Sequence, residues 1–127
     1  MRVVHNLVVS AAFGVIAAFG MSTQALAVCE VSGEIFYMHD NDQRKNVART
    51  DMHGCDLHFI TRGKVRFTSA KIVSKPTNGS LHKIAHLEFR YKPRRGFKGN
   101  DAFVLSVCGQ TEKGKGCSTL HYDAVVE

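Results

Sequence analysis

Histidines interspersed with acidic residues offer the first candidate chemistry. Imidazole and carboxylate groups are the usual protein ligands of zinc and copper. His39, His53 and His58 could bind one metal ion if their segments folded together. No fixed ligand motif such as His-Glu-x-x-His connects them, so scattered surface histidines are the favoured interpretation. A periplasmic metal-binding protein that uses these three histidines is therefore the second-ranked hypothesis for the function, after the binding module described below.

A second candidate site is a dense group of basic residues in the C-terminal half. The chain has a formal net charge of +6, which favours weak attraction to polyanions. The group is a candidate anion-binding surface, although a solvated basic face is the simpler interpretation. It consists of Arg90, Lys92, Arg94, Arg95 and Lys98.

Two aromatic residues within this basic group, Tyr91 and Phe97, could suggest base stacking on a nucleic acid. The alternation of apolar and polar residues along this segment instead predicts that both rings point inward. The N-terminus also carries the pattern of an export signal, described below, and an exported chain rarely meets nucleic acid. We therefore expect a partner protein or an anionic envelope polymer.

Catalytic motifs are absent from the sequence. There is no Gly-x-Ser-x-Gly and no Cys-x-x-Cys. The four cysteines are an even number, which in an exported chain predicts disulfides rather than a free nucleophilic thiol. We expect no enzyme activity and no cofactor, and a small secreted hydrolase ranks below the two binding interpretations.

The N-terminus has the pattern of a secretory signal peptide. Arg2 and His5 precede an apolar run from Leu7 to Met21, and Ala25-Leu26-Ala27 supplies small residues at a cleavage site. The run is too short to span a bilayer comfortably. The pattern predicts a signal peptide over residues 1–27 and one periplasmic or secreted domain over residues 28–127.

A lipoprotein is the minor alternative for this N-terminus. Residues 26–29 resemble a lipobox, in which a lipid is attached to Cys29. Val28 is larger than the residue usual before that cysteine. Lipidation would also leave an odd number of cysteines in an oxidising compartment.

The elements that must position these residues are short strands. Apolar and polar residues alternate along seven or so segments, with turns between them and no long helical period. Residues 39–54 read as a loop or a short helix at most. The pattern predicts an all-β sandwich. The expected strands cover residues 34–38, 56–61, 64–68, 70–73, 87–91, 103–107 and 119–126.

The last two strands suggest how the cysteines pair. Cys108 and Cys117 each lie on the face opposite the large apolar side chains, so a hairpin would bring them together. The remaining pair, Cys29 and Cys55, would then fasten the N-terminus to the domain. Four cysteines allow three pairings, of which this is the favoured one.

One stretch resembles a known family. The segment 75–81 and the pattern Tyr-x-Pro-x-x-Gly-Phe-x-Gly-x-Asp-x-Phe are similar to bacterial immunoglobulin-like, cadherin-like repeat domains. The resemblance covers residues 72–126 and does not extend over residues 28–70, and the four cysteines are not typical of the family. It implies an immunoglobulin-like sandwich that acts as a recognition or spacer module without catalytic residues, here as a single exported copy. The pattern is matched at Tyr91, Pro93, Gly96, Phe97, Gly99, Asp101 and Phe103.

These motif residues have structural roles that need no family. Pro93 and Gly96 can shape a corner, and Gly99 allows a tight return. Phe97 can close the open end of the core. We expect Asp101 to accept backbone N–H bonds in that corner.

Overall fold

The computed structural model describes residue 20 and residues 26–127. The predicted signal peptide therefore falls almost wholly outside the described residues.

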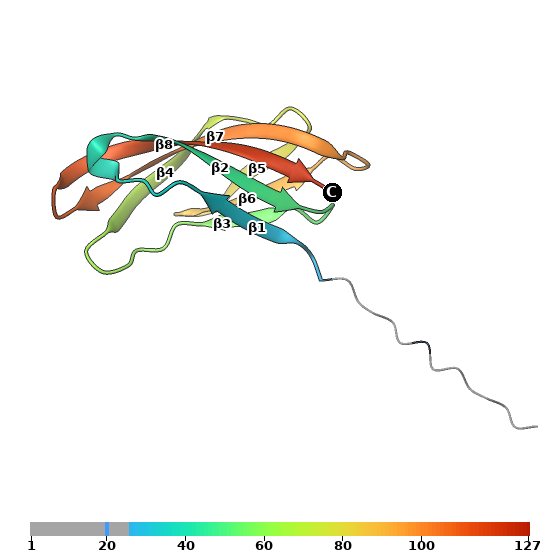
Figure 1. The fold of residues 1–127 in the computed structure, drawn as a ribbon, viewed down its shortest axis with the longest axis horizontal. Helices are drawn as coiled ribbons and strands as arrows, with labels where there is room; N and C mark the ends of the chain where they lie inside the picture. The colour runs from blue at the N-terminus through green and yellow to red at the C-terminus, as the bar shows by residue number, and fades with distance from the viewer. Residues whose placement is uncertain (1–19, 21–25) are drawn as a thin grey trace, which may run out of the picture.

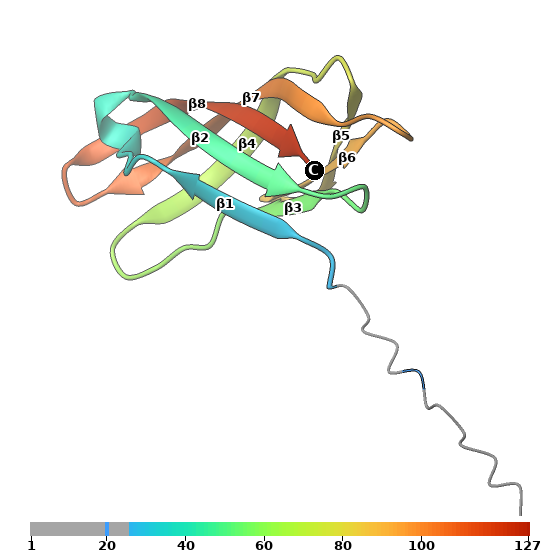
Figure 2. The same cartoon turned by 45° about the vertical axis from the view of Figure 1, so that its right-hand side comes forward.

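The described chain folds into two β-sheets and one short 3₁₀ turn (Figures 1 and 2). The larger sheet has the order β1-β2-β8-β7-β4, and the smaller has the order β3-β6-β5. All paired strands are antiparallel except β2 and β8, which are parallel. The all-β class predicted from the sequence is confirmed. The elements are β1 (Cys29–Gly33), η1 (Met38–Asp40), β2 (Gln43–Thr50), β3 (Cys55–His58), β4 (Arg66–Ser74), β5 (Gly79–Ala85), β6 (Glu88–Pro93), β7 (Gly99–Thr111) and β8 (Gly114–Val126).

The core lies between the sheets and is built by the alternation seen in the C-terminal half. Successive side chains of a strand point to opposite faces, so every second residue is buried from Asp101 to Gly109 in β7 and from Ser118 to Val126 in β8. At the centre the Phe103 ring is stacked between Tyr91 and Tyr122, with centroids 5.5 and 5.0 Å away. The main buried side chains are Leu57, Leu81, Phe89, Tyr91, Phe103, Leu105, Val107, Leu120 and Tyr122.

The N-terminal half departs from the sequence-based expectation. The strand expected over residues 34–38 is wrong, because residues 34–37 are irregular and η1 follows them. The loop expected over residues 39–54 contains β2, which pairs with a strand on each side. The buried residues of β2 are small or polar, so tertiary pairing formed a strand that apolar alternation did not show.

The turn η1 closes one end of the sandwich. Met38 is almost fully buried there, with 1% of its surface exposed. It lies against Gly109 and Gly116, which are paired residues of β7 and β8. A Cβ at Gly116 would lie 2.0 Å from the Met38 carbonyl oxygen, so only glycine admits η1 at this distance.

We expect Gly116→Ala to destabilise the fold by about 1–3 kcal/mol, because the added methyl group must displace η1. Lys115→Ala, at the neighbouring exposed position, is the matched control and should change stability by less than about 0.5 kcal/mol. Denaturant unfolding of the two variants measures the difference. Equal stability of the two variants would contradict this role for Gly116.

Two disulfides join the elements as the sequence predicted. Cys108 and Cys117 are directly opposite in the β7–β8 register. Cys29 on β1 is bonded to Cys55 on β3, which ties the two sheets together. The lipoprotein alternative conflicts with this structure, because a lipid on Cys29 would need the sulfur that bonds Cys55. Neither disulfide involves a residue of the basic group.

Burial of two tyrosines predicts loss of stability in alkali. Burial raises the pKa of Tyr122 to about 12, and burial together with Asp101 raises the pKa of Tyr91. The unfolded chain releases these protons near pH 10, whereas the folded chain holds them to higher pH. The stabilisation is therefore complete below about pH 10 and falls as the pH rises toward 12. Denaturant unfolding between pH 8 and 11 should show a shallower loss for Tyr122→Phe than for the unchanged protein.

Candidate anion-binding site

The basic group lies around a tight turn between β6 and β7. Phe97 N–H donates to the carbonyl oxygen of Arg94 at 2.9 Å, which closes the turn. Gly96 has φ 79°, a conformation that favours glycine. Both Arg94 and Arg95 are exposed on this turn, whereas Phe97 packs partly against the core. Gly96 thus has the conformation expected of a residue that shapes the corner.

A buried carboxylate holds the turn in place. Asp101 is 6% exposed and accepts the N–H groups of Thr77 and Asn78 at 3.1 Å and the hydroxyl of Tyr91 at 2.9 Å. The carbonyl oxygen of Asn78 in turn accepts the N–H of Arg94 at 2.7 Å. Asp101 therefore fixes the turn through two neighbouring segments, and the expectation that it accepts backbone N–H bonds is confirmed.

A second turn approaches the basic group from the connection between β2 and β3. Gly54 lies so close to β6 that a Cβ there would be 2.1 Å from the carbonyl oxygen of Tyr91. This approach places Met52 and His53 beside the β6–β7 turn. The sequence pattern relates His53 only to the metal hypothesis, because its approach to β6 depends on a contact between distant segments.

Two surface hollows lie at this corner, and Lys92, Pro93 and Arg94 line both of them. The larger has a volume of about 450 Å³ and also contacts Met52, His53, Arg95 and Gly96. The smaller, of about 320 Å³, is completed by Thr77, Gly79 and Ser80. No acidic residue is among the described residues that line either hollow.

The charges within the basic group are not equivalent. Arg90 donates two hydrogen bonds to the Asp56 carboxylate, at 2.7 and 2.8 Å. This pairing lowers the pKa of Asp56 and neutralises the Arg90 charge. Lys92, Arg94, Arg95 and Lys98 form no ion pair with any other described residue. We call Lys92, Arg94 and Arg95 with the two hollows the basic corner.

The three histidines of the metal hypothesis lie in three different places. His39 is in η1, His53 is in the turn before β3, and His58 is on the outer face of β3. Each faces its own carboxylate: Asp40, Asp51 and Glu88, respectively. Across residues 26–127, no group of three possible metal ligands comes together.

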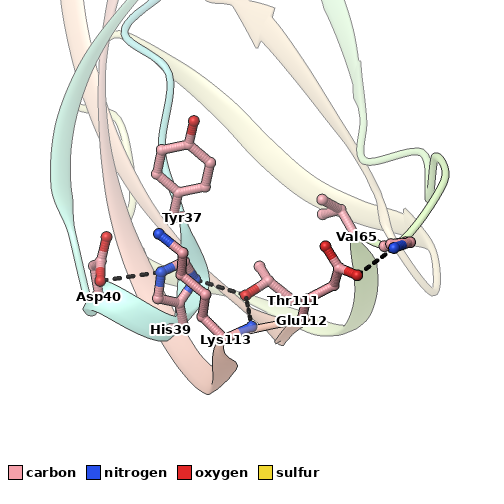
Figure 3. A pocket seen from close by; sticks show the side chains of 8 residues that line it. Tyr37, His39, Asp40, Val65, Thr111, Glu112 and Lys113 are labelled. Carbon is pink, nitrogen blue, oxygen red and sulfur yellow. Dashed lines mark hydrogen bonds and ion pairs between the residues drawn. The ribbon is translucent and has the colours of Figure 1, made fainter.

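A third hollow, of about 400 Å³, lies at η1 near the tip of the β7–β8 hairpin (Figure 3). His39 contacts the Thr111 hydroxyl at 2.7 Å and the Asp40 carboxylate at 3.1 Å. An ion pair joins Lys64 to Glu112. The sequence does not point to this hollow, because its residues come from three distant segments and share no motif. Charges of both signs line it, so it does not favour a polyanion.

Comparison with protein-family models, curated proteins and solved structures finds no match. Any function of the basic corner must therefore be inferred from its residues and their arrangement alone. Among the described residues, no helix has the length and apolar character needed to cross a membrane. Two disulfides are compatible with an exported protein, because such bonds persist in oxidising compartments.

Proposed function

We propose that this chain is an exported, non-enzymatic binding module that recognises an anionic polymer of the cell envelope through the basic corner. The observation that carries the proposal is the charge of this surface. Lys92 and Arg94 line both adjoining hollows and Arg95 lines the larger one, and none of the described residues in either lining is acidic. A chain of regularly spaced anionic groups could occupy both hollows and contact all three side chains.

The surroundings of the corner support a rigid mode of recognition. The turn is fastened to the core by Asp101 and to β2–β3 by the close approach of Gly54. Side chains on a fixed backbone lose little additional backbone entropy on binding. Arg90 is paired with Asp56, so in this proposal it contributes less to the affinity for the polymer than the unpaired basic residues do.

An immunoglobulin-like, cadherin-like identity is part of the same proposal. Its support is the sequence pattern, together with a strand order in which β2 runs parallel to β8 and β3-β6-β5 form the opposing sheet. Recognition by loops and corners of a rigid sandwich is common in such folds, whereas fold alone assigns no activity. A periplasmic or secreted location follows from the signal-peptide pattern and agrees with the disulfides.

Dextran sulfate and uncharged dextran form a matched pair of probes for this proposal. The protein should bind dextran sulfate, and the logarithm of its affinity should fall linearly with the logarithm of salt concentration as counterions are released. Dextran should not bind. Isothermal titration at several salt concentrations measures both. Equal affinity for the two polymers, or no salt dependence, would refute recognition by charge.

A further inference from the structure

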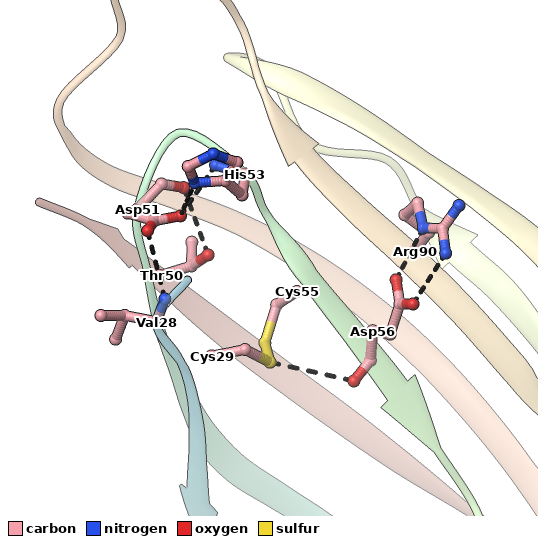
Figure 4. Close-up of a disulfide and its surroundings, with 8 residues drawn as sticks. All are labelled: Val28, Cys29, Thr50, Asp51, His53, Cys55, Asp56 and Arg90. Carbon is pink, nitrogen blue, oxygen red and sulfur yellow. Dashed lines mark hydrogen bonds and ion pairs between the residues drawn. A yellow bond between two sulfur atoms is a disulfide. The ribbon is translucent and has the colours of Figure 1, made fainter. Parts of the chain in front are cut away.

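The backbone nitrogen of Val28 lies beside a carboxylate at the start of the described domain. It is 3.1 Å from one oxygen of Asp51, as Figure 4 shows. The other oxygen of Asp51 accepts the His53 N–H at 2.8 Å and faces its ring nitrogen Nδ1 at 3.0 Å. One oxygen of the Asp51 carboxylate therefore binds Val28, and the other binds His53.

We propose that Asp51 is the binding site for the α-ammonium group that a signal peptidase creates by hydrolysing the Ala27–Val28 bond. Water adds across this amide. The carbonyl carbon of Ala27 gains the hydroxyl group and becomes the carboxylate of the released leader, while the nitrogen of Val28 leaves as an amine. An α-amino group has a pKa near 7.7–8.0, so at neutral pH this amine is largely protonated.

The position of Val28 suits this role without any rearrangement. Its neighbour Cys29 is held by the disulfide to Cys55 and by pairing with Thr50 on β2. The new terminus therefore stays where the amide nitrogen already lies. The existing bond, from an uncharged N–H to the Asp51 carboxylate, becomes an ion pair between an ammonium group and the same carboxylate, which is stronger. Ala27 and Val28 are both exposed, so the bond to be cleaved is accessible.

The electrostatic surroundings favour a cation at this point. The backbone N–H of His53, with smaller contributions from Val28 N–H and the His53 ring, lowers the pKa of Asp51, so its carboxylate is ionised at neutral pH. Close to Thr50, Arg49 at the end of β2 is paired with Glu127, and the two charges compensate each other.

Cleavage also changes the charge next to the basic corner, a consequence that rests on the proposed function. His53 lines the larger hollow and is bonded to Asp51. Once the ammonium group neutralises Asp51, the charge of this carboxylate no longer opposes an anionic ligand. We expect the processed chain to bind dextran sulfate several-fold more tightly than the same chain with its Val28 amine acetylated, because acetylation removes the charge that neutralises Asp51.

The test is an NMR pH titration of the Val28 α-amino group in the exported protein, after mass spectrometry has established its first residue. The α-amino pKa should be above the usual range in the unchanged protein and return to it in Asp51→Asn. Asp123→Asn, which changes an exposed acid on β8, is the matched control and should leave this pKa unchanged. Because the folded pKa is raised, the pair stabilises the fold below about pH 8, and this effect is lost as the pH rises through the folded pKa.

A chain that begins at another residue, or an α-amino pKa that is the same with and without Asp51, would overturn the inference. Affinity for dextran sulfate separates it from the proposed function. If no form of the protein binds the polymer, the proposed function fails, whereas the Val28 titration still decides whether Asp51 binds the terminus.

Discussion

Replacing Arg94 and Arg95 together by glutamate is expected to lower the affinity for dextran sulfate on the order of a hundredfold at low salt. Each basic residue beside an anionic surface contributes about 1 kcal/mol, and reversal of the charge adds repulsion to that loss. Both side chains are exposed, so the fold should remain intact. The effect should shrink as salt is raised, because screening weakens attraction and repulsion alike. Isothermal titration provides the affinities.

The matched control changes the same charges at the other end of the molecule. Arg62 and Arg66 are exposed near the start of β4, where Arg66 pairs with Gln110 close to the tip of the β7–β8 hairpin (Figure 1). Their joint replacement by glutamate alters net charge equally but should reduce affinity only a few-fold. Similar losses in the two variants would mean that the polymer responds to overall charge rather than to the basic corner.

Asp101→Ala is expected to cause the largest loss of stability, about 3–5 kcal/mol. The substitution removes the acceptor of the buried Tyr91 hydroxyl and of the part-buried N–H groups of Thr77 and Asn78, and an unsatisfied donor that is fully buried costs about 1–3 kcal/mol. Denaturant unfolding with both disulfides intact measures the free energy. The exposed Asp123 supplies the control, since Asp123→Ala should stay within about 0.5 kcal/mol of the unchanged protein.

Tyr91→Phe dissects this network further. It removes one of the bonds to Asp101 and should cost about 1–2 kcal/mol. The double variant should lose less than the sum of the two single losses, because the residues share one interaction. Additive losses would show that the Tyr91 hydroxyl and Asp101 act independently.

The strands of the C-terminal half could be predicted because the alternation of apolar and polar residues along each strand is visible in its own sequence. Along β7 and β8 the large apolar residues alternate with polar ones, and burial follows this alternation closely. The pairing of Cys108 with Cys117 could be derived from the same alternation. The acceptance of backbone N–H bonds by Asp101 could be predicted because this residue lies between a turn-rich segment and the following strand residues.

The N-terminal half depended on contacts that its sequence does not display. Of the buried residues in β2, Asn46 and Thr50 are polar and Ala48 is small, so they carry no apolar signal. This strand exists because β1 and β8 pair with it. Because these residues are polar or small, residues 39–54 had the pattern of a loop, and β2 was not predicted.

The basic corner was predictable only as a list of residues. Sequence proximity joined Arg90 to the group, whereas in the structure its charge is neutralised by Asp56 across the sheet. Conversely, His53 lies at the corner because Gly54 permits close approach to β6, a contact between distant segments. Charge pairing and proximity of this kind depend on strand register, which the sequence pattern does not give.

The most direct measurement is an NMR titration of the ¹⁵N-labelled, disulfide-intact protein with a short dextran sulfate fragment. Binding at the basic corner predicts the largest amide shift changes around residues 52–53, 77–80 and 92–96, with little change near η1 and the β7–β8 tip. Shift changes centred on η1 or spread evenly over the surface, or none at all at low salt, would contradict the account.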